Sequence, residues 1–311
     1  TVMIGGTLPM LHSGYRVGKG ETIILESCEY CNSFLHFFPT VAVVLNVEED
    51  HLDFFKNLDD IKASFRKFAQ LVPPEGRVVA NADNPGTMDA LRGLPLFTFG
   101  CVPEADCRAE NLTWNRGRPD FDVVVGGDLY AHLSLRVAGM HNVYNALAAA
   151  AAAYTLGISG KAVRQGLEGF FGAGRRFEFK GQFNGAKIYD DYAHHPAELH
   201  ALLDMARTLG YERVICAFQP HTYTRTKALF DDFVRELKAA DLVVLTDIYA
   251  AREKNTIGVS SKELADQIPG SLYCPSLGEA ADCLRELAQT GDLIITVGAG
   301  DIYTVGEALV G

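Results

Sequence analysis

The sequence predicts an α/β protein built from two domains. Short runs of β-branched and apolar residues, typical of buried strands, alternate with longer segments of helical periodicity. This alternation favours βαβ units and a mostly parallel sheet, whose central strands are continuous apolar runs. A length of 311 residues suits two domains of ordinary size.

The elements follow one another in strand–helix order. Strands are expected at 22–25, 41–46, 78–80, 214–218, 242–246 and 293–297. Helices are expected at 61–71, 142–156, 196–209, 226–239, 261–267 and 277–290. In 120–137, strand-like runs flank Gly126-Gly127-Asp128, which predicts a hairpin that adds antiparallel strands to the first domain. The glycine-rich stretch 170–176 breaks the pattern, so the predicted domains are 1–174 and 175–311.

Composition and charge exclude several kinds of partner. The net charge is −11, whereas binding to nucleic acid or to anionic lipid requires a basic face. No run of 18 apolar residues is present, so membrane insertion is not expected. Seven scattered cysteines, an odd number in a chain of this size, favour a reducing compartment.

Polar side chains gather where expected strands end, which is the edge of an open α/β sheet at which ligands bind. Glu26 follows the strand at 22–25, and a carboxylate there suits Mg²⁺, which prefers oxygen ligands. A capping or solvated acid is the alternative. Four acids and His51 follow the strand that begins at Val41. The imidazole can ligate a metal or hold a carboxylate that does, and a surface salt bridge is the alternative.

Asn142 and Asn145 lie three residues apart on the first turn of an expected helix. A side-chain amide can recognise a nucleobase edge because it has both donors and acceptors. A plain N-cap is the alternative for Asn142.

In the second domain, 189–196 and 218–226 bring three His, two Asp and one Arg to neighbouring strand ends. So many polar groups are poor candidates for a core, so they predict a functional site.

Glycines and arginines give weaker signals. Arg175 and Arg176 are candidates for phosphate contact, since guanidinium forks suit phosphate oxygens, and a solvated hinge is the alternative. Gly298-Ala299-Gly300 is weak evidence for a nucleotide site, because close packing of strand on helix also explains it. No segment has the complete phosphate-binding pattern G-x-x-x-x-G-K-[ST].

The order and spacing of these clusters resemble the muramyl (Mur) ligases, which form amide bonds in peptidoglycan synthesis at the expense of ATP. The resemblance extends over nearly the whole chain. It is carried by Glu26 with Ser33-Phe34-Leu35-His36, Asn46-x-Glu48-x-Asp50-His51-Leu52-Asp53, His141-Asn142-x-x-Asn145-Ala146, Gly174-Arg175-Arg176-Phe177, Asp190-Asp191-Tyr192-x-His194-His195-Pro196 and Gln219-Pro220-His221.

The resemblance implies part of a central ATPase domain, with a mostly parallel sheet and an antiparallel addition, followed by a Rossmann-like C-terminal α/β domain. It implies that the family's UDP-binding first domain and phosphate-binding loop are absent and that this chain alone is inactive. The cofactors implied are ATP and Mg²⁺. The double His and the Gln-Pro-His segment favour the member that joins L-alanine to UDP-N-acetylmuramate through an acyl phosphate. A bacterial cytoplasmic location and a monomer or weak homodimer are expected.

Matching motifs carry the family's residue roles onto this chain. The implied roles are Mg²⁺ ligation by Glu26 and His51, nucleotide contact by Asn142, Asn145 and Asp191, phosphate or hinge contact by Arg175 or Arg176, and catalysis by His194, His221 and Arg225. One position departs from the pattern, since Thr222 stands where some members have Arg. Binding of the amino-acid carboxylate then falls to Arg225 or Lys227. A ligase for recycled murein tripeptide or another amide former, and a non-catalytic binding module, are the alternatives.

Overall fold

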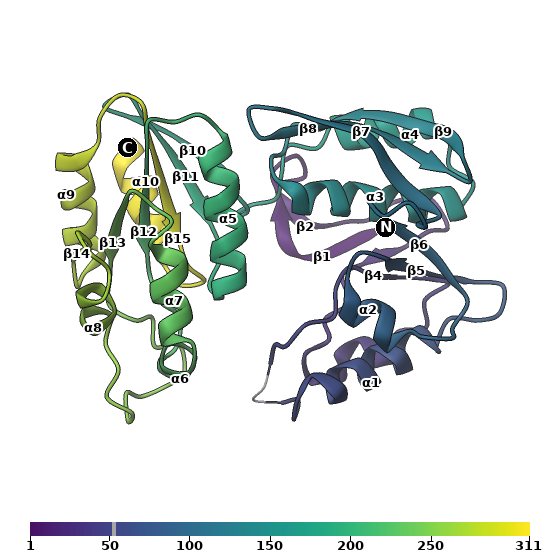
Figure 1. Cartoon of the computed structure of the whole chain (residues 1–311), viewed down its shortest axis with the longest axis horizontal. Coiled ribbons are helices and arrows are strands. Elements are labelled where there is room, and N and C mark those ends of the chain that lie inside the picture. The colour runs from purple at the N-terminus through teal and green to yellow at the C-terminus, as the bar shows by residue number, and fades with distance from the viewer. Residues whose placement is uncertain (52–53) are drawn as a thin grey trace. The chain divides into compact units, whose positions relative to one another are not determined.

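The computed structural model describes residues 1–51 and 54–311 (Figure 1). The chain divides into two compact units. Unit 1 comprises residues 1–5 and 13–171, and unit 2 comprises residues 6–12 and 172–311. Each unit combines a six-stranded, largely parallel sheet with helices, so the predicted α/β class is confirmed. Within the described residues, no helix is long and apolar enough to cross a membrane.

The large sheet of unit 1 has the strand order β4-β5-β6-β7-β8-β9. Its strands are β4 (Val41–Val44), β5 (Arg77–Asn81), β6 (Leu96–Gly100), β7 (Cys107–Asn115), β8 (Arg118–Val125) and β9 (Asp128–Ser134). Strands β4 to β7 pair in parallel, whereas β8 pairs antiparallel with both β7 and β9. Gly126 and Gly127 turn the chain between β8 and β9 with positive φ, so the predicted hairpin is confirmed.

Helices cover both faces of this sheet. They are α1 (Leu58–Ala69), α2 (Pro85–Ala90), α3 (Met140–Thr155) and α4 (Gly160–Glu168), preceded by the 3-10 helix η1 (Tyr30–His36). Side chains alternate across β5: Val79 packs in a core cluster with α3 and α4, whereas Val78 and Ala80 pack in a cluster with α1 and α2. The alanine-rich α3 contacts strands β4 to β8, because small side chains let the backbones approach closely.

A small sheet of order β2-β1-β3 contains β1 (Val2–Leu8), β2 (Ser13–Arg16) and β3 (Ile24–Leu25). Val2 and Met3 of β1 pair in parallel with β3. The strand expected at 22–25 is thus real but shorter, and Glu26 follows its end directly.

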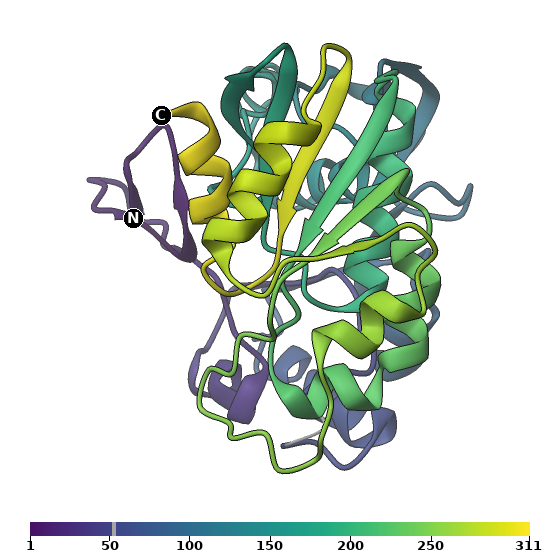
Figure 2. The ribbon, with the colours of Figure 1, turned by 90° about the vertical axis from the view of Figure 1, so that its left-hand side faces the viewer.

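The sheet of unit 2 has the order β10-β11-β15-β12-β13-β14. Its strands are β10 (Glu178–Phe183), β11 (Ala186–Asp191), β12 (Arg213–Phe218), β13 (Leu242–Leu245), β14 (Leu272–Tyr273) and β15 (Asp292–Val297). β10 pairs antiparallel with β11, and the remaining neighbours pair in parallel. Figure 2 shows these twisted strands side by side, with helices packed on the sheet.

Six helices accompany this sheet: α5 (Pro196–Thr208), α6 (Tyr223–Ala228), α7 (Phe230–Leu237), α8 (Ser261–Asp266), α9 (Leu277–Leu287) and α10 (Tyr303–Val310). Buried residues of α9 and α10 pack on one face, and α5 and α7 lie together on the other (Figure 1). The single helix expected at 226–239 is wrong, because Leu229 leaves the helical conformation (φ −113°, ψ 24°) and separates α6 from α7.

Candidate functional site

The carboxyl ends of β11, β12 and β15 lie level in the sheet of unit 2. Val297 pairs with Asp191 on one side and with Phe218 on the other. The segments that follow the three strands therefore start at the same edge of the sheet, where ligands bind in open α/β folds. These segments are 192–195, 219–222 and 298–302.

The first segment is fixed by the start of α5. His195 is the N-cap, and its Nδ1 accepts a hydrogen bond from the Ala197 N–H at 3.4 Å. Glu198 Oε2 accepts from the N–H groups of both His194 (2.8 Å) and His195 (3.1 Å). Pro196 lies in the first helical turn, as predicted, because its missing N–H costs nothing there.

The structure brings the three predicted catalytic side chains together. The ring centroids of His194 and His221 lie 5.9 Å apart, and Arg225 Nη1 is 3.4 Å from His221 Nδ1. A guanidinium only donates, so His221 Nδ1 accepts and the proton of its neutral ring is on Nε2. His194 Nδ1 lies 3.0 Å from the carbonyl oxygen of Tyr192, which only accepts, so His194 carries a proton on Nδ1.

The charge state of His221 follows from these neighbours. Burial lowers its pKa from 6.5 to about 4, and the positive charges of His194 and Arg225 act in the same direction. Glu253 opposes the shift but is held by the Thr224 N–H at 3.0 Å. The ring of His221 is therefore neutral at pH 7 and presents an N–H donor beside the fixed positive charge of Arg225.

Tyr249, which no sequence pattern indicated, holds His221 in place. The Tyr249 N–H donates to Pro220 O at 2.8 Å, and the Thr222 N–H donates to Tyr249 O at 2.9 Å. The rings of His221 and Tyr249 stack with centroids 5.5 Å apart and an interplanar angle of 18°. Thr222 has φ 68°, a strained conformation for a β-branched residue, and the bond to Tyr249 helps to hold it.

Asp191 is buried at the end of β11. Its Oδ2 accepts from the Phe177 N–H at 2.7 Å and its Oδ1 from the Ala193 N–H at 2.8 Å. Burial nevertheless raises the pKa of this carboxyl to about 6. Both oxygens thus already bind the main chain, and the expected contact with a ribose stays a prediction.

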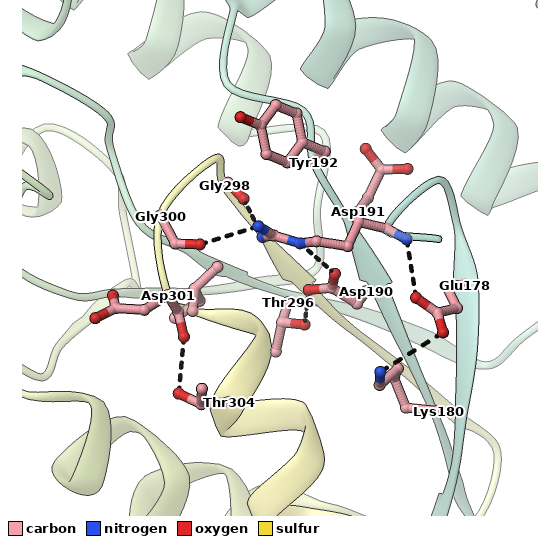
Figure 3. Close-up of polar contacts among 12 residues, drawn as sticks. Glu178, Lys180, Asp190, Asp191, Tyr192, Thr296, Gly298, Gly300, Asp301 and Thr304 are labelled. Carbon is pink, nitrogen blue, oxygen red and sulfur yellow. Dashed lines mark hydrogen bonds and ion pairs between the residues drawn. The ribbon is translucent and has the colours of Figure 1, made fainter. Parts of the chain in front are cut away.

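Arg175 and Arg176 have different surroundings. Arg175 donates from Nε to Asp190 Oδ2 (3.0 Å), from Nη1 to Gly300 O (3.0 Å) and from Nη2 to Gly298 O (2.6 Å). Figure 3 labels these three acceptors. All three nitrogens of its guanidinium thus already donate to protein oxygens. The side chain of Arg176 is 59% exposed and reaches Glu198 only at 4.0 Å. Contact of either arginine with phosphate stays a prediction, and the geometry favours Arg176.

Glu26, one of the two predicted metal ligands, lies in unit 1 and is exposed. Its Oε2 accepts from the Gly5 N–H at 2.7 Å. Within residues 1–51 and 54–311, no three His, Cys, Asp or Glu side chains are grouped to hold a metal ion. Since Mg²⁺ commonly takes one or two carboxylates together with water and phosphate oxygens, Glu26 remains a suitable ligand.

His51, the second predicted metal ligand, contacts Glu29, the N-cap residue of η1. Its Nε2 lies 3.2 Å from Glu29 Oε1, and its ring lies 4.7 Å from that of Tyr30. This is the salt-bridge alternative, and it leaves metal binding by His51 a prediction. Leu52 and Asp53 of the same motif lie outside the described residues.

The two asparagines lie at the start of α3. Gly139 is the N-cap, so the N-cap alternative for Asn142 is wrong. Asn142 Nδ2 donates to Ala138 O at 2.7 Å, and Asn145 Nδ2 donates to Asn142 Oδ1 at 3.3 Å. Asn145 is exposed, so its amide can meet a ligand, and the nucleobase contact stays a prediction.

Two family models match this chain. The Mur ligase middle domain matches residues 10–153, and the glutamate ligase domain of Mur ligases matches residues 175–300. The matches lie on unit 1 and unit 2 respectively, apart from a few residues of the β1–β2 connection.

Individual proteins match as well. The UDP-N-acetylmuramate–L-alanine ligase of Caldanaerobacter subterraneus is 46% identical over 314 residues, which is 99% of this chain and 68% of that protein. The crystal structure of UDP-N-acetylmuramate-alanine ligase MurC from Thermotoga maritima superposes with a TM-score of 0.83 at 28% identity, covering 99% of this chain and 67% of that chain. MurF ligase from Thermotoga maritima, solved with ADP, shares the fold at 17% identity, with a TM-score of 0.73 and coverage of 99% and 72%.

Proposed function

Since this chain belongs to the Mur ligase family, we propose that it acts in the ATP-dependent joining of L-alanine to the lactyl carboxylate of UDP-N-acetylmuramate. The relative with 46% identity supports these substrates. The observation that carries the chemistry is the cluster of His194, His221 and Arg225 at the carboxyl edge of the unit 2 sheet. We propose 1–174 as the ATP-binding domain and 175–311 as the ligase domain.

The proposed reaction has two steps. The γ-phosphoryl group of ATP passes to a carboxylate oxygen of UDP-N-acetylmuramate, which gives an acyl phosphate and ADP. The amine nitrogen of L-alanine then attacks the acyl carbon, the bond to the phosphate oxygen breaks, and the amine loses a proton. Negative charge develops on oxygen in both steps, so positioned donors and positive charges lower both barriers.

The three side chains divide this work. Arg225 supplies a fixed positive charge for the carboxylate of L-alanine or for the acyl phosphate, and His221 donates to the same anion through Nε2–H. His194 Nδ1 faces Tyr192 O, which only accepts, so the ring nitrogen that can take up a proton when His194 is neutral is Nε2. We propose that Nε2 of His194 accepts the proton that the amine loses.

ATP and Mg²⁺ are the proposed cofactors, and bound Mg²⁺ would neutralise phosphate charge. The exposed carboxylate of Glu26 fits a hard cation that binds oxygen, and the exposed amide of Asn145 fits a nucleobase edge. The proposed contacts are Glu26 and His51 for Mg²⁺, Asn142 and Asn145 for the base, Asp191 for the ribose and Arg176 for phosphate. Because the 311 residues contain no complete phosphate-binding loop, we expect no turnover by these residues alone.

The test is phosphate release that depends on ATP, L-alanine and UDP-N-acetylmuramate. It compares this chain with the same chain preceded by a UDP-binding domain and phosphate-binding loop from a Mur ligase. Release by the extended protein alone, and its loss in His194→Ala, supports the proposal. Release with murein tripeptide and none with L-alanine would instead support the recycling ligase. An extended protein that is folded but inactive with all amino acids and peptides would support the binding module. Turnover by the 311 residues alone would contradict the requirement for a phosphate-binding loop.

A further inference from the structure

The turn after β15, residues 298–302, packs directly against the segment that carries His221. Gln219 bridges the two: its Nε2 donates to Asp301 Oδ1 at 2.8 Å, and its Oε1 accepts from the Ile302 N–H at 3.2 Å. The Gln219 N–H also donates to Val297 O at 2.9 Å. The 298–302 turn and Gln219 therefore form one hydrogen-bonded unit, and His221 follows two residues later.

The glycines of this turn permit that packing. A Cβ atom at Gly298 would lie 2.7 Å from Gln219 O, and one at Gly300 would overlap Gln219 Oε1 and lie 2.7 Å from Tyr249 Cγ. Gly298 also has φ +149°, which side chains rarely allow. Tyr249 in turn stacks on His221. A displacement of the turn would therefore reach His221 by two routes, through Gln219 and through Tyr249.

Arg175 fixes the turn from its other side. Its two terminal nitrogens donate to the carbonyl oxygens of Gly298 and Gly300, and its Nε donates to Asp190. The guanidinium carbon also lies 4.9 Å from the ring centroid of Tyr192 and 4.7 Å from that of Tyr303. Both the plane and the rotation of the guanidinium are thereby set.

Asp190 anchors this arrangement in the core. It is fully buried, and its Oδ1 accepts from the hydroxyl of Thr296 on β15 at 2.7 Å. Burial raises the pKa of Asp190, whereas Thr296 and Arg175 act against the shift. A buried carboxylate needs a cationic partner. Replacing Arg175 therefore leaves Asp190 without its cation and also removes the two hydrogen bonds that hold the 298–302 turn.

We propose that Arg175 is a positioning residue for His221: it holds the 298–302 turn, which sets the imidazole through Gln219 and Tyr249. Its donors are directed at Asp190 and at two main-chain oxygens, so phosphate contact is left to Arg176. The consequence for catalysis rests on the proposed function, whereas the effect on the position of His221 does not. Lysine cannot replace Arg175, because its donors all lie on one nitrogen, whereas Arg175 reaches three separate acceptors from three nitrogens of a planar group.

The test follows the imidazole of His221 directly. Ring-¹⁵N-labelled histidine in the 311-residue chain gives a spectrum for each of the nine His, and His221→Asn identifies the signals of His221. In the unsubstituted chain we expect a neutral ring with its proton on Nε2 at pH 7. In Arg175→Lys we expect displaced His221 signals and a pKa that moves from about 4 toward 6.5 as the ring loosens.

Arg213→Lys is the matched control. Arg213 forms a two-bond ion pair with Asp292 (3.0 and 2.7 Å) in the same sheet, but at the opposite ends of β12 and β15. It should therefore destabilise unit 2 without changing the His221 signals. Gly300→Ala disturbs the turn without touching the ion pair. It is expected to displace the His221 signals, and if Arg175→Lys does not fold it still tests the link from the turn to the imidazole, which the proposal requires.

Unchanged His221 signals in folded Arg175→Lys or in Gly300→Ala would overturn the proposal. So would equal displacement in Arg213→Lys, which would show a general loosening of unit 2.

In the extended ligase, Arg175→Lys should lower kcat about tenfold to a hundredfold, as small misplacements of reacting groups do, and leave the KM for ATP unchanged. A raised KM for ATP with unchanged kcat would contradict the positioning role and support phosphate binding by Arg175. If the extended protein has no ligase activity, the histidine spectra still decide whether Arg175 positions His221.

Discussion

The buried carboxyl of Asp191 makes the stability of unit 2 depend on pH. Asp191 is 9% exposed, and its pKa of about 6 in the folded protein compares with 3.8 for an ordinary Asp. The difference of about 2 pKa units corresponds to about 3 kcal/mol at about 1.4 kcal/mol per unit. Because the folded state binds the proton more tightly, this stabilisation is complete below pH 3.8 and is lost as the pH rises through 6.

Asp191→Asn should remove that dependence. Between pH 4.5 and 7.5, the folded protein with Asp191 loses about 2 of the 3 kcal/mol, because pH 4.5 is still well below the folded pKa. Asn cannot titrate, so the free energy of unfolding of the variant should lack this slope. At pH 7.5 the variant escapes the buried charge, but its NH₂ group faces one of the two main-chain N–H donors, which costs about 1–3 kcal/mol.

Urea unfolding at several pH values, followed by circular dichroism, measures this effect. Trp114, the single tryptophan, lies in unit 1, so its fluorescence identifies the transition of unit 1 and leaves the remaining signal to unit 2. Glu286→Gln removes an exposed carboxylate from the same unit and should leave the slope unchanged. Equal slopes for Asp191→Asn and the unsubstituted chain would refute the reasoning. They would mean that the N–H groups of Phe177 and Ala193 outweigh burial and keep the pKa of Asp191 low.

Three further predictions concern packing, metal and proton transfer. Gly160→Ala should destabilise unit 1 by about 1–3 kcal/mol, because its Cβ would overlap Tyr130 O. Gly166→Ala in the same helix meets no atom within 4 Å and should stabilise unit 1 by about 0.5–1 kcal/mol. Trp114 fluorescence during urea unfolding measures both effects. Glu26→Gln should raise the Mg²⁺ concentration for half-maximal activity of the extended ligase by about tenfold or more, and an unchanged value would exclude Glu26 as a ligand. His194→Ala should lower kcat about 10²–10⁴-fold at saturating L-alanine, and a change in KM alone would contradict proton acceptance by His194.

The sequence predicted the central strands well because burial on both faces leaves a continuous apolar run. The strands expected at 214–218 and 293–297 differ from β12 and β15 by one residue at the start. β1 and β7 were missed, since both are only partly buried and have no such run. The break between α6 and α7 was missed because Leu229 fits a helical pattern, and only its backbone conformation separates the two helices.

The sequence also predicted part of the site. The sequence placed His194, His221 and Arg225 together at neighbouring strand ends; in the structure β15 lies between β11 and β12, and the register of the sheet brings the three strand ends level. The partners of Arg175 were not predictable, since two of its three acceptors are main-chain oxygens that carry no sequence signal. Tyr249 was missed for a similar reason: its link to His221 depends on two main-chain bonds between segments that are distant in the chain.

The neutral state of His221 bears on how an amino acid can react at this site. The amine of L-alanine must lose its positive charge before it attacks, whereas its carboxylate must keep a cationic partner. In the proposed reaction Arg225, which is always charged, is that partner, and Thr222 adds no second arginine. A protonated His221 would add a second positive charge and bind the carboxylate more tightly. That charge would stabilise the bound carboxylate before the reaction as well as in the transition state, so it would not by itself raise the rate. Because burial, His194 and Arg225 lower the pKa of His221 to about 4, its neutral ring adds a directed N–H donor without a full charge. Nδ1 of His194 faces Tyr192 O, so the proposed proton acceptor is its Nε2. The proposed proton acceptance by His194 and donation by His221 both rest on what faces Nδ1 of each ring, a carbonyl oxygen for His194 and a guanidinium for His221.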